Sequence, residues 1–300
     1  TAIYFGMEVY GVERGYAGLI DDELFRMEMR SVSNIVQCGG TKLRTARCME
    51  MLTVEGQKKA VDTLEKHGIE GLVVIGGDGS FRGAKVLSEE YGIPTIGIPG
   101  TIDNDLEYTD YTLGFDTAVN TCLDIINKLR DTMTSHERVS VVEVMGRHCG
   151  DIALYSGIAS GAEIIVVPEL PFDMNEIASR INRSRAQGKH SNIIVVAEAV
   201  MSAEKFANQL QQVTEYSVRP TCIGHVQRGG SPTPFDRNLS TRMGGHATEL
   251  IANHQFGRMV TLKGDEISSL PLSEVAGKLK VVTEDHDLIV QGRRMGICFG

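Results

Sequence analysis

The chain has 300 residues, which at roughly 150 residues per domain indicates two domains. Its hydrophobic fraction of 42% and charged fraction of 23% are ordinary for a soluble enzyme, whereas its net charge of −9 argues against a broad nucleic-acid-binding surface. No apolar run approaches the roughly 20 residues of a membrane helix, and the 6 cysteines are scattered as free thiols would be. We therefore expect a cytoplasmic protein without nucleic-acid or membrane partners.

The first residues read as the last turn of a helix that runs into a strand, and the chain has no initiator methionine. Because a domain rarely starts in mid-element, we expect the natural N-terminus to lie upstream. Residues 57–66 then carry apolar side chains at helical spacing, and Gly68 follows as a C-terminal cap. Residues 72–75 form a short apolar run, which predicts a strand buried on both faces.

The order of strand, polar loop and helix repeats along the rest of the chain. We expect further strands at 95–99, 139–144, 193–197 and 221–223, and helices at 84–90, at about 117–130 and after residue 151. This alternation predicts parallel sheets with helices on both faces. The strands end in glycine and polar residues, which predicts one ligand-binding crevice at their carboxyl ends.

Residues 76–80, Gly-Gly-Asp-Gly-Ser, follow the first buried strand and precede a helix. The glycines let backbone N–H groups approach an anion, the helix N-terminus attracts negative charge, and Asp78 can hold Mg²⁺. The segment is neither the dinucleotide fingerprint nor the Walker motif. It therefore predicts a phosphate-binding loop, with a tight turn capped by Asp78 as the alternative.

Residues 100–105, Gly-Thr-Ile-Asp-Asn-Asp, end the next strand. If the chain stays extended, Thr101, Asp103 and Asp105 project to the same side. A carboxylate beside a magnesium–phosphate site indicates phosphoryl transfer to a hydroxyl group, with the carboxylate accepting the proton. The alternative is a capping loop, because Asp and Asn favour turns and helix N-termini.

Cationic residues near other strand ends fit the same chemistry. Arg147 follows the strand at 139–144 and is placed to stabilise charge on a phosphoryl group in transfer. A set suited to a phosphorylated polyol lies at or next to strand ends: Arg138, Arg219, Arg228, Glu198 and His225. Taken singly, each arginine is more readily explained as a solvated surface residue, and His225 as a structural histidine.

The motifs together, in their order and spacing, resemble the bacterial 6-phosphofructokinases. They are Gly-Gly-Asp-Gly-Ser at 76–80, Pro-Gly-Thr-Ile-Asp-Asn-Asp at 99–105, Val-Glu-Val-Met-Gly-Arg at 142–147, the strand that ends in Glu198, and Gly-His-Val-Gln-Arg-Gly-Gly-Ser-Pro at 224–232. The resemblance implies two Rossmann-like, three-layer α/β domains with mainly parallel sheets and an active site in the cleft between them. It implies an ATP-binding domain at 1–114 plus about 227–281, and a fructose 6-phosphate-binding domain at 115–226 plus about 282–300.

The resemblance also implies an activity, which is transfer of the ATP γ-phosphate to the 1-hydroxyl of fructose 6-phosphate by a homotetramer with Mg²⁺. Asp103 would be the base, Arg147 would stabilise the transition state, Thr101 would touch the transferred group, Asp105 would organise the loop, and Asp78 would hold Mg²⁺. The residues lining the nucleotide would be Tyr16, Arg47, Cys48, Gly79 and Ser80. The residues holding the sugar phosphate would be Met145, Gly146, Glu198, His225 and Arg228, with Arg138 and Arg219 reaching its phosphate from a neighbouring subunit.

The resemblance has consequences for the donor, for regulation and for the start of the chain. Gly79 and Gly100 favour ATP, because pyrophosphate-using relatives typically carry Asp and Lys there. This chain matches part of the family's regulatory site for ADP or phosphoenolpyruvate, at Ser33, Arg130, Glu163 and Lys189. The family's opening strand and glycine-rich loop have no match in this chain, so a molecule that begins at Thr1 is expected to turn over weakly or not at all.

Three other functions compete with this one. A pyrophosphate-dependent phosphofructokinase would differ mainly in its donor site. A non-catalytic subunit that senses sugar phosphate usually lacks the base or the Mg²⁺ ligand, whereas this chain keeps Asp103 and Asp78. The NAD and lipid kinases share a Gly-Gly-Asp-Gly loop, but that loop alone explains neither the segment at 101–105 nor the arginines.

Overall fold

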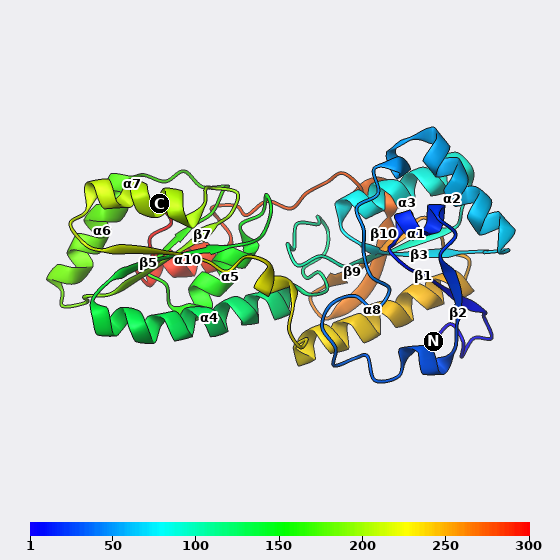
Figure 1. The fold of residues 1–300 in the computed structure, drawn as a ribbon, viewed down its shortest axis with the longest axis horizontal. Helices are drawn as coiled ribbons and strands as arrows, with labels where there is room; N and C mark the ends of the chain where they lie inside the picture. Colours follow the sequence, from blue (N-terminus) through cyan, green and yellow to red (C-terminus); the bar gives the residue numbers. More distant parts are fainter. The chain divides into compact units, whose positions relative to one another are not determined.

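The computed structural model describes residues 1–300, which divide into two compact units. The first unit comprises residues 1–101, 106–113 and 231–279, and the second comprises 102–105, 114–230 and 280–300. Figure 1 shows that each unit is a sheet flanked by helices. The segment 102–105 belongs to the second unit, whereas the predicted domain boundaries put it in the first, because Asn104 and Asp105 hydrogen-bond to Asp151 and Lys280 there.

The first unit is built on a four-stranded sheet in the order β10-β9-β4-β3. Strands β3 (Leu72–Gly76), β4 (Thr95–Pro99) and β9 (Arg258–Lys263) are parallel, and β10 (Glu266–Pro271) pairs antiparallel with β9. A separate antiparallel hairpin joins β1 (Val9–Val12) to β2 (Leu24–Met27). The helices of this unit are α1 (Tyr16–Ile20), η1 (Met29–Val32), η2 (Glu50–Leu52), α2 (Val54–Lys66), α3 (Asp78–Tyr91), α8 (Pro234–Ala252) and α9 (Leu272–Val275).

Helices cover both faces of this sheet, but they leave its β3 edge partly open. Helices α3 and α9 pack with Val74 and Met259 on one face, and α8 packs with Ile96 and Ile98 on the other. On β3, Val73 and Ile75 are 37% and 62% exposed, so the prediction that this strand is buried on both faces is wrong. Their partners in register are Ile96 and Ile98, which places them on the α8 face at the edge of the sheet, beyond the cover of that helix.

The second unit holds a four-stranded parallel sheet in the order β6-β7-β5-β8. Its strands are β5 (Val139–Val144), β6 (Ile164–Val166), β7 (Asn192–Ala197) and β8 (Val218–Cys222). Its helices are α4 (Phe115–His136), α5 (Asp151–Ser160), α6 (Met174–Ala186), α7 (Ala203–Val213), η3 (Gly224–Arg228) and α10 (Asp287–Arg294). The prediction of two α/β domains with mainly parallel sheets is therefore confirmed.

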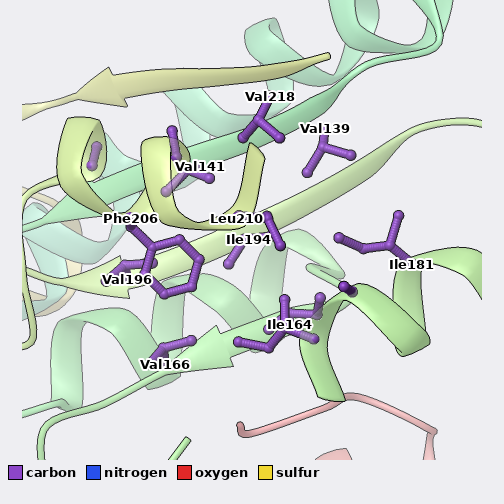
Figure 2. Packing of buried hydrophobic residues seen from close by; sticks show 14 residues of the cluster. Val139, Val141, Ile164, Val166, Ile181, Ile194, Val196, Phe206, Leu210 and Val218 are labelled. Carbon is purple, nitrogen blue, oxygen red and sulfur yellow. The ribbon is translucent and has the colours of Figure 1, made fainter. Parts of the chain in front are cut away.

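The core of the second unit forms between this sheet and the helices α6 and α7. Figure 2 shows alternate residues of the strands, such as Val139 and Val141, packed towards Phe206 and Leu210 of α7. Helix α5 lies on the opposite face, where Gly157 is so close to Ile165 that an added Cβ would approach its side chain to 2.6 Å. The sheet is thus enclosed on both sides, as its nearly continuous apolar strands require.

The predicted elements agree best with the structure at buried strands and least well at helix ends. Strands β4 and β5 have the predicted bounds. Helix α3 begins at Asp78 rather than Ala84, because Gly77 serves as its N-cap and the glycine-rich segment enters the first turn. Helix α4 continues to His136, beyond the predicted end near residue 130, and its buried face extends to Met133. No helix combines the length and the apolar character that a bilayer crossing needs.

Candidate active site

Asp103 lies at the centre of a group of charged side chains in the second unit. Burial, followed by the negative charges of Asp105 and Glu198, raises the pKa of Asp103 from 3.8 to about 6. The positive charges of Arg147 and Arg228 act in the opposite direction. A carboxyl group with this pKa is ionised at neutral pH and is more basic than an ordinary aspartate, so it is suited to accept a proton from a hydroxyl group.

The loop that carries Asp103 turns instead of running straight. Asn104 adopts the left-handed conformation with φ 51°, and the premise that Thr101, Asp103 and Asp105 alternate along an extended chain is therefore wrong. Asn104 and Asp105 are buried, at 0% and 4% exposure. Of the alternative interpretation, the turn is present at Asn104, whereas no helix is capped here, because the next helix, α4, begins at Phe115 with Gly114 as its N-cap.

The end of β5 delivers Met145, Gly146 and Arg147 beside the end of β7. Gly146 has φ 136°, and a Cβ there would lie 2.5 Å from the carbonyl oxygen of Cys149, so this turn requires glycine. The backbone N–H of Arg147 donates to Oε1 of Glu198 at 2.9 Å. Since β5 and β7 are parallel neighbours, their carboxyl ends place Arg147 and Glu198 together, as predicted from the strand ends.

Gln227 is a residue of this site that the sequence patterns do not reveal. Its side chain is 1% exposed, and its Oε1 accepts from the backbone N–H of Met145 at 3.0 Å and from the thiol of Cys122 at 3.2 Å. It thereby ties the η3 turn, which carries the exposed His225 and Arg228, to the end of β5. The only signal in the sequence is its place inside the motif at 224–232.

Arg138 and Arg219 lie at the opposite end of the same sheet. Arg138 directly precedes β5, and Arg219 pairs in register with Ser140 near the start of that strand. A strand rises about 3.3 Å per residue, so Arg138 is on the order of 20 Å from Met145 along β5. Within one chain, the structure therefore does not bring these two arginines together with Glu198 and His225, and their predicted contribution from a neighbouring subunit stays a prediction.

The glycine-rich segment of the first unit forms the N-terminus of α3. Gly79 lies in its first turn, and an added Cβ would meet no heavy atom within 4 Å. The Tyr16 hydroxyl donates to the carbonyl oxygen of Ser80 at 2.6 Å, and burial raises the pKa of that phenol. Cys48 packs against the same hydrophobic cluster as Tyr16, and Arg47 is exposed beside it. Of the predicted nucleotide-binding residues, Tyr16, Gly79 and Ser80 thus lie at a helix N-terminus, which suits phosphate.

The family model for phosphofructokinase matches residues 1–251. The chain belongs to the phosphofructokinase family. It is 53% identical over 281 residues to the ATP-dependent 6-phosphofructokinase of Paenibacillus macquariensis, covering 93% of this chain and 87% of that relative. It is 57% identical over 274 residues to the Clostridium tetani enzyme of the same name, covering 91% and 86%. Among solved structures, Pichia pastoris phosphofructokinase in the T-state matches with a TM-score of 0.86 and 32% identity, covering 92% of this chain and 32% of that one.

In this phosphofructokinase, Asp78 is the residue expected to hold Mg²⁺. Its carboxylate accepts from the backbone N–H of Gly277 at 2.6 Å and from Nε of Arg82 at 2.8 Å. Each oxygen keeps a further lone pair, and protein magnesium sites often use one carboxylate together with substrate phosphates. No group of three or more His, Cys, Asp or Glu side chains that could hold a metal ion by itself is present, at Asp78 or elsewhere. The residues present therefore fit a magnesium ion held largely by ATP.

Of the four residues expected to bind an effector of this phosphofructokinase, three contact one another and the fourth belongs to the other unit. Arg130 and Lys189 both form ion pairs with Glu163, and Arg130 also donates to the carbonyl oxygen of Ser160 at 2.7 Å. These residues belong to the second unit. Ser33 belongs to the first unit, where it is exposed and its hydroxyl donates to the carbonyl oxygen of Met29 at 3.4 Å.

Proposed function

We propose that this phosphofructokinase transfers the γ-phosphoryl group of ATP to the 1-hydroxyl of fructose 6-phosphate, giving fructose 1,6-bisphosphate and ADP in the committed step of glycolysis. The observation that carries the proposal is the environment of Asp103, which combines a raised pKa with two nearby arginines. The close relatives are named ATP-dependent 6-phosphofructokinases, in agreement with this reaction. The chain is thus assigned as a kinase with an alcohol acceptor.

In the proposed mechanism, the residues of the candidate site have separate tasks. Asp103 accepts the proton of the sugar hydroxyl as that oxygen attacks phosphorus. The guanidinium of Arg147 balances the negative charge on the transferred phosphoryl group, and Thr101 contacts that group. Met145, Gly146, Glu198, His225 and Arg228 orient the sugar phosphate. When bound by Asp78, Mg²⁺ would neutralise charge on the ATP phosphates.

The packing around Gly100 favours ATP over pyrophosphate as the donor. A Cβ at this position would lie 2.9 Å from Cγ2 of Ile75 and 3.3 Å from the backbone nitrogen of Gly76. A lysine, which the pyrophosphate-using relatives are expected to carry here, would therefore require the Ile75 side chain and the adjoining backbone of Gly76 to shift. At Gly79, in contrast, a side chain has room, and its absence leaves space for a nucleotide phosphate at the start of α3.

A coupled assay tests the proposed reaction. The purified protein is incubated with fructose 6-phosphate and either ATP or pyrophosphate, in the presence of Mg²⁺, and fructose 1,6-bisphosphate is measured. We expect product with ATP only. Product with pyrophosphate alone would support the pyrophosphate-dependent alternative, and calorimetric binding of fructose 6-phosphate without turnover would support the sensing subunit. In a separate incubation with ATP and NAD, phosphorylation of NAD by a protein that does not phosphorylate the sugar would support an NAD kinase.

We also propose a homotetramer in which Arg138 and Arg219 bind the sugar phosphate of a neighbouring subunit. Their place at the amino ends of β5 and β8 supports this, since Glu198 follows the carboxyl end of a neighbouring strand. Arg219→Ala and Asp103→Asn chains are each expected to be nearly inactive alone. Mixed, dissociated and reassembled, they should regain activity, because some sites then combine an intact Asp103 with an intact Arg219. Persistent inactivity of hybrids, at a tetrameric mass by light scattering, would contradict the shared site.

We further propose that Arg130, Glu163, Lys189 and Ser33 contribute to a regulatory site for ADP or phosphoenolpyruvate. Both cations pair with Glu163 and are available to an anionic effector if those pairs open. Lys189→Met is expected to reduce the effect of either compound on the KM for fructose 6-phosphate, while kcat without effector stays unchanged. An undiminished effect would exclude Lys189 from that site.

The six free cysteines support our proposal that the enzyme works in the reducing cytoplasm.

A further inference from the structure

A buried polar cluster lies beside the loop that carries Asp103. It consists of Asn104, Asp151 and Lys280, and both Asn104 and Asp151 are 0% exposed. The side-chain amide of Asn104 donates to Oδ2 of Asp151 at 2.7 Å, and the ammonium group of Lys280 donates to the same oxygen at 2.8 Å. Two side chains that are far apart in the sequence thus converge on one carboxylate oxygen.

Lys280 contacts the loop through its backbone and Asp151 through its side chain. Its N–H donates to the carbonyl oxygen of Asp105 at 3.0 Å. Asp151 is the first residue of α5, whose following residues Ile152, Ala153 and Leu154 are fully buried. A carboxylate at a helix N-terminus is stabilised by the helix dipole, and the packed helix gives it a fixed position. Asn104 is therefore bonded to α5 directly, and Asp105 is connected to it through Lys280.

The conformation of Asn104 sets the direction of the catalytic side chain. Its left-handed backbone, with φ 51°, is unfavourable for most residues and is tolerated by Asn or Gly. The hydrogen bond to Asp151 compensates for this strain and fixes the turn. Because Asp103 directly precedes the turn, a change at Asn104 would reorient the carboxylate relative to Arg147 and Glu198.

We propose that Asp151 is a positioning residue for phosphoryl transfer, which holds the loop 102–105 through Asn104 and Lys280 and thereby aims Asp103 at the sugar hydroxyl. This inference rests on the proposed function, in which Asp103 takes the proton. The Lys280 ammonium balances the charge of Asp151, so the cluster adds no net negative charge beside Asp103. Burial, followed by the charges of Asp151 and Glu169, raises the pKa of the neighbouring Cys149 thiol, and Glu169 accepts from the backbone N–H groups of Gly150 and Val282.

Single substitutions separate positioning from stability. Asn104→Gly keeps the left-handed backbone accessible and removes only the amide, Lys280→Met removes the ammonium, and Lys280→Arg preserves its charge. We expect Asn104→Gly and Lys280→Met to lower kcat about 10-fold to 100-fold with the KM for fructose 6-phosphate changed by less than about 3-fold, because small misplacements of catalytic groups have such effects. Lys280→Arg should keep much of the wild-type kcat. In Asn104→Gly, the pKa of Asp103, followed by ¹³C NMR of its carboxyl carbon, should fall towards its ordinary value as the loop becomes hydrated.

Arg180→Met provides the matched control. Arg180 is a partly buried cation of the same unit that donates to the carbonyl oxygen of Gly296, so its loss tests stability without touching the loop. If Asn104→Gly and Lys280→Met reduce only the unfolding free energy, as Arg180→Met should, and leave kcat and the pKa of Asp103 unchanged, the inference is overturned. Should wild-type protein show no turnover, the proposed function fails, and the NMR measurement on Asn104→Gly still decides the inference. That variant loses one hydrogen bond to the Asp151 carboxylate and leaves the Lys280 ion pair in place, so it carries the test if Lys280→Met does not fold.

Discussion

Replacing Asp103 by asparagine is expected to remove most turnover and, at the same time, to stabilise the protein at neutral pH. Loss of a general base typically lowers kcat by about 10²-fold to 10⁴-fold. Binding of fructose 6-phosphate should persist, because the residues proposed to hold it, including Glu198 and His225, are unchanged. The coupled assay measures the loss of turnover, and calorimetric titration with fructose 6-phosphate measures whether binding persists.

The gain in stability follows from the raised pKa of Asp103. Burial and the charges of Asp105 and Glu198 raise this pKa from 3.8 to about 6 in the folded protein. A group whose pKa is higher in the folded state than in the unfolded state favours folding below about pH 4, and this contribution is lost as the pH rises through 6. At pH 7 the ionised carboxylate therefore destabilises the fold by up to about 3 kcal/mol, at 1.36 kcal/mol for each pKa unit.

Asparagine carries no charge, so Asp103→Asn should require more urea to unfold at pH 7, and this difference should vanish near pH 4. Asp131→Asn, at an exposed position of α4, serves as the control and should change neither turnover nor the unfolding midpoint. An Asp103→Asn protein that is less stable than wild type at pH 7 would contradict the assigned environment. One that keeps its turnover would contradict the assignment of Asp103 as the base.

The sequence allowed the strand ends to be placed because their signals are local. An apolar run followed by glycine and polar residues marks the end of a buried parallel strand, as at Val144 and Ala197. Parallel neighbours then bring Arg147 and Glu198 together without further information. By the same reasoning, Arg138 precedes β5 and therefore lies at the amino end of that strand, away from Arg147 and Glu198.

Other features depend on contacts between distant segments, and no local pattern reveals them. The left-handed turn at Asn104 is stabilised by Asp151, and Lys280 reaches the same carboxylate from the end of the chain. The exposure of Ile75 depends on how far α8 extends over the sheet. The pKa of Asp103 likewise results from burial within the folded unit, which the order of residues at 100–105 does not disclose.

Replacing Arg147 by alanine is expected to have the second large effect, on both rate and pH dependence. Loss of a cation that stabilises charge in a phosphoryl-transfer transition state lowers kcat by about 10³-fold or more. The positive charge of Arg147 also lowers the pKa of Asp103, so its removal should raise that pKa above the wild-type value of about 6. The acidic limb of the profile of kcat/KM against pH should then move to higher pH, because Asp103 must be ionised to accept a proton.

Matched variants separate the two roles of Arg147. Arg147→Lys keeps the charge and should leave the acidic limb near its wild-type pH, although kcat still falls because lysine lacks the bidentate geometry of arginine. Alanine adds no backbone strain, since arginine already occupies this left-handed position with φ 55°. Glu198→Gln should move the acidic limb the other way, because the charge of Glu198 raises the pKa of Asp103. Burial is the largest cause of the raised pKa of Asp103, so Glu198→Gln should not restore the ordinary value. Identical acidic limbs in the Arg147→Ala and Arg147→Lys variants would show that the charge of Arg147 does not act on Asp103.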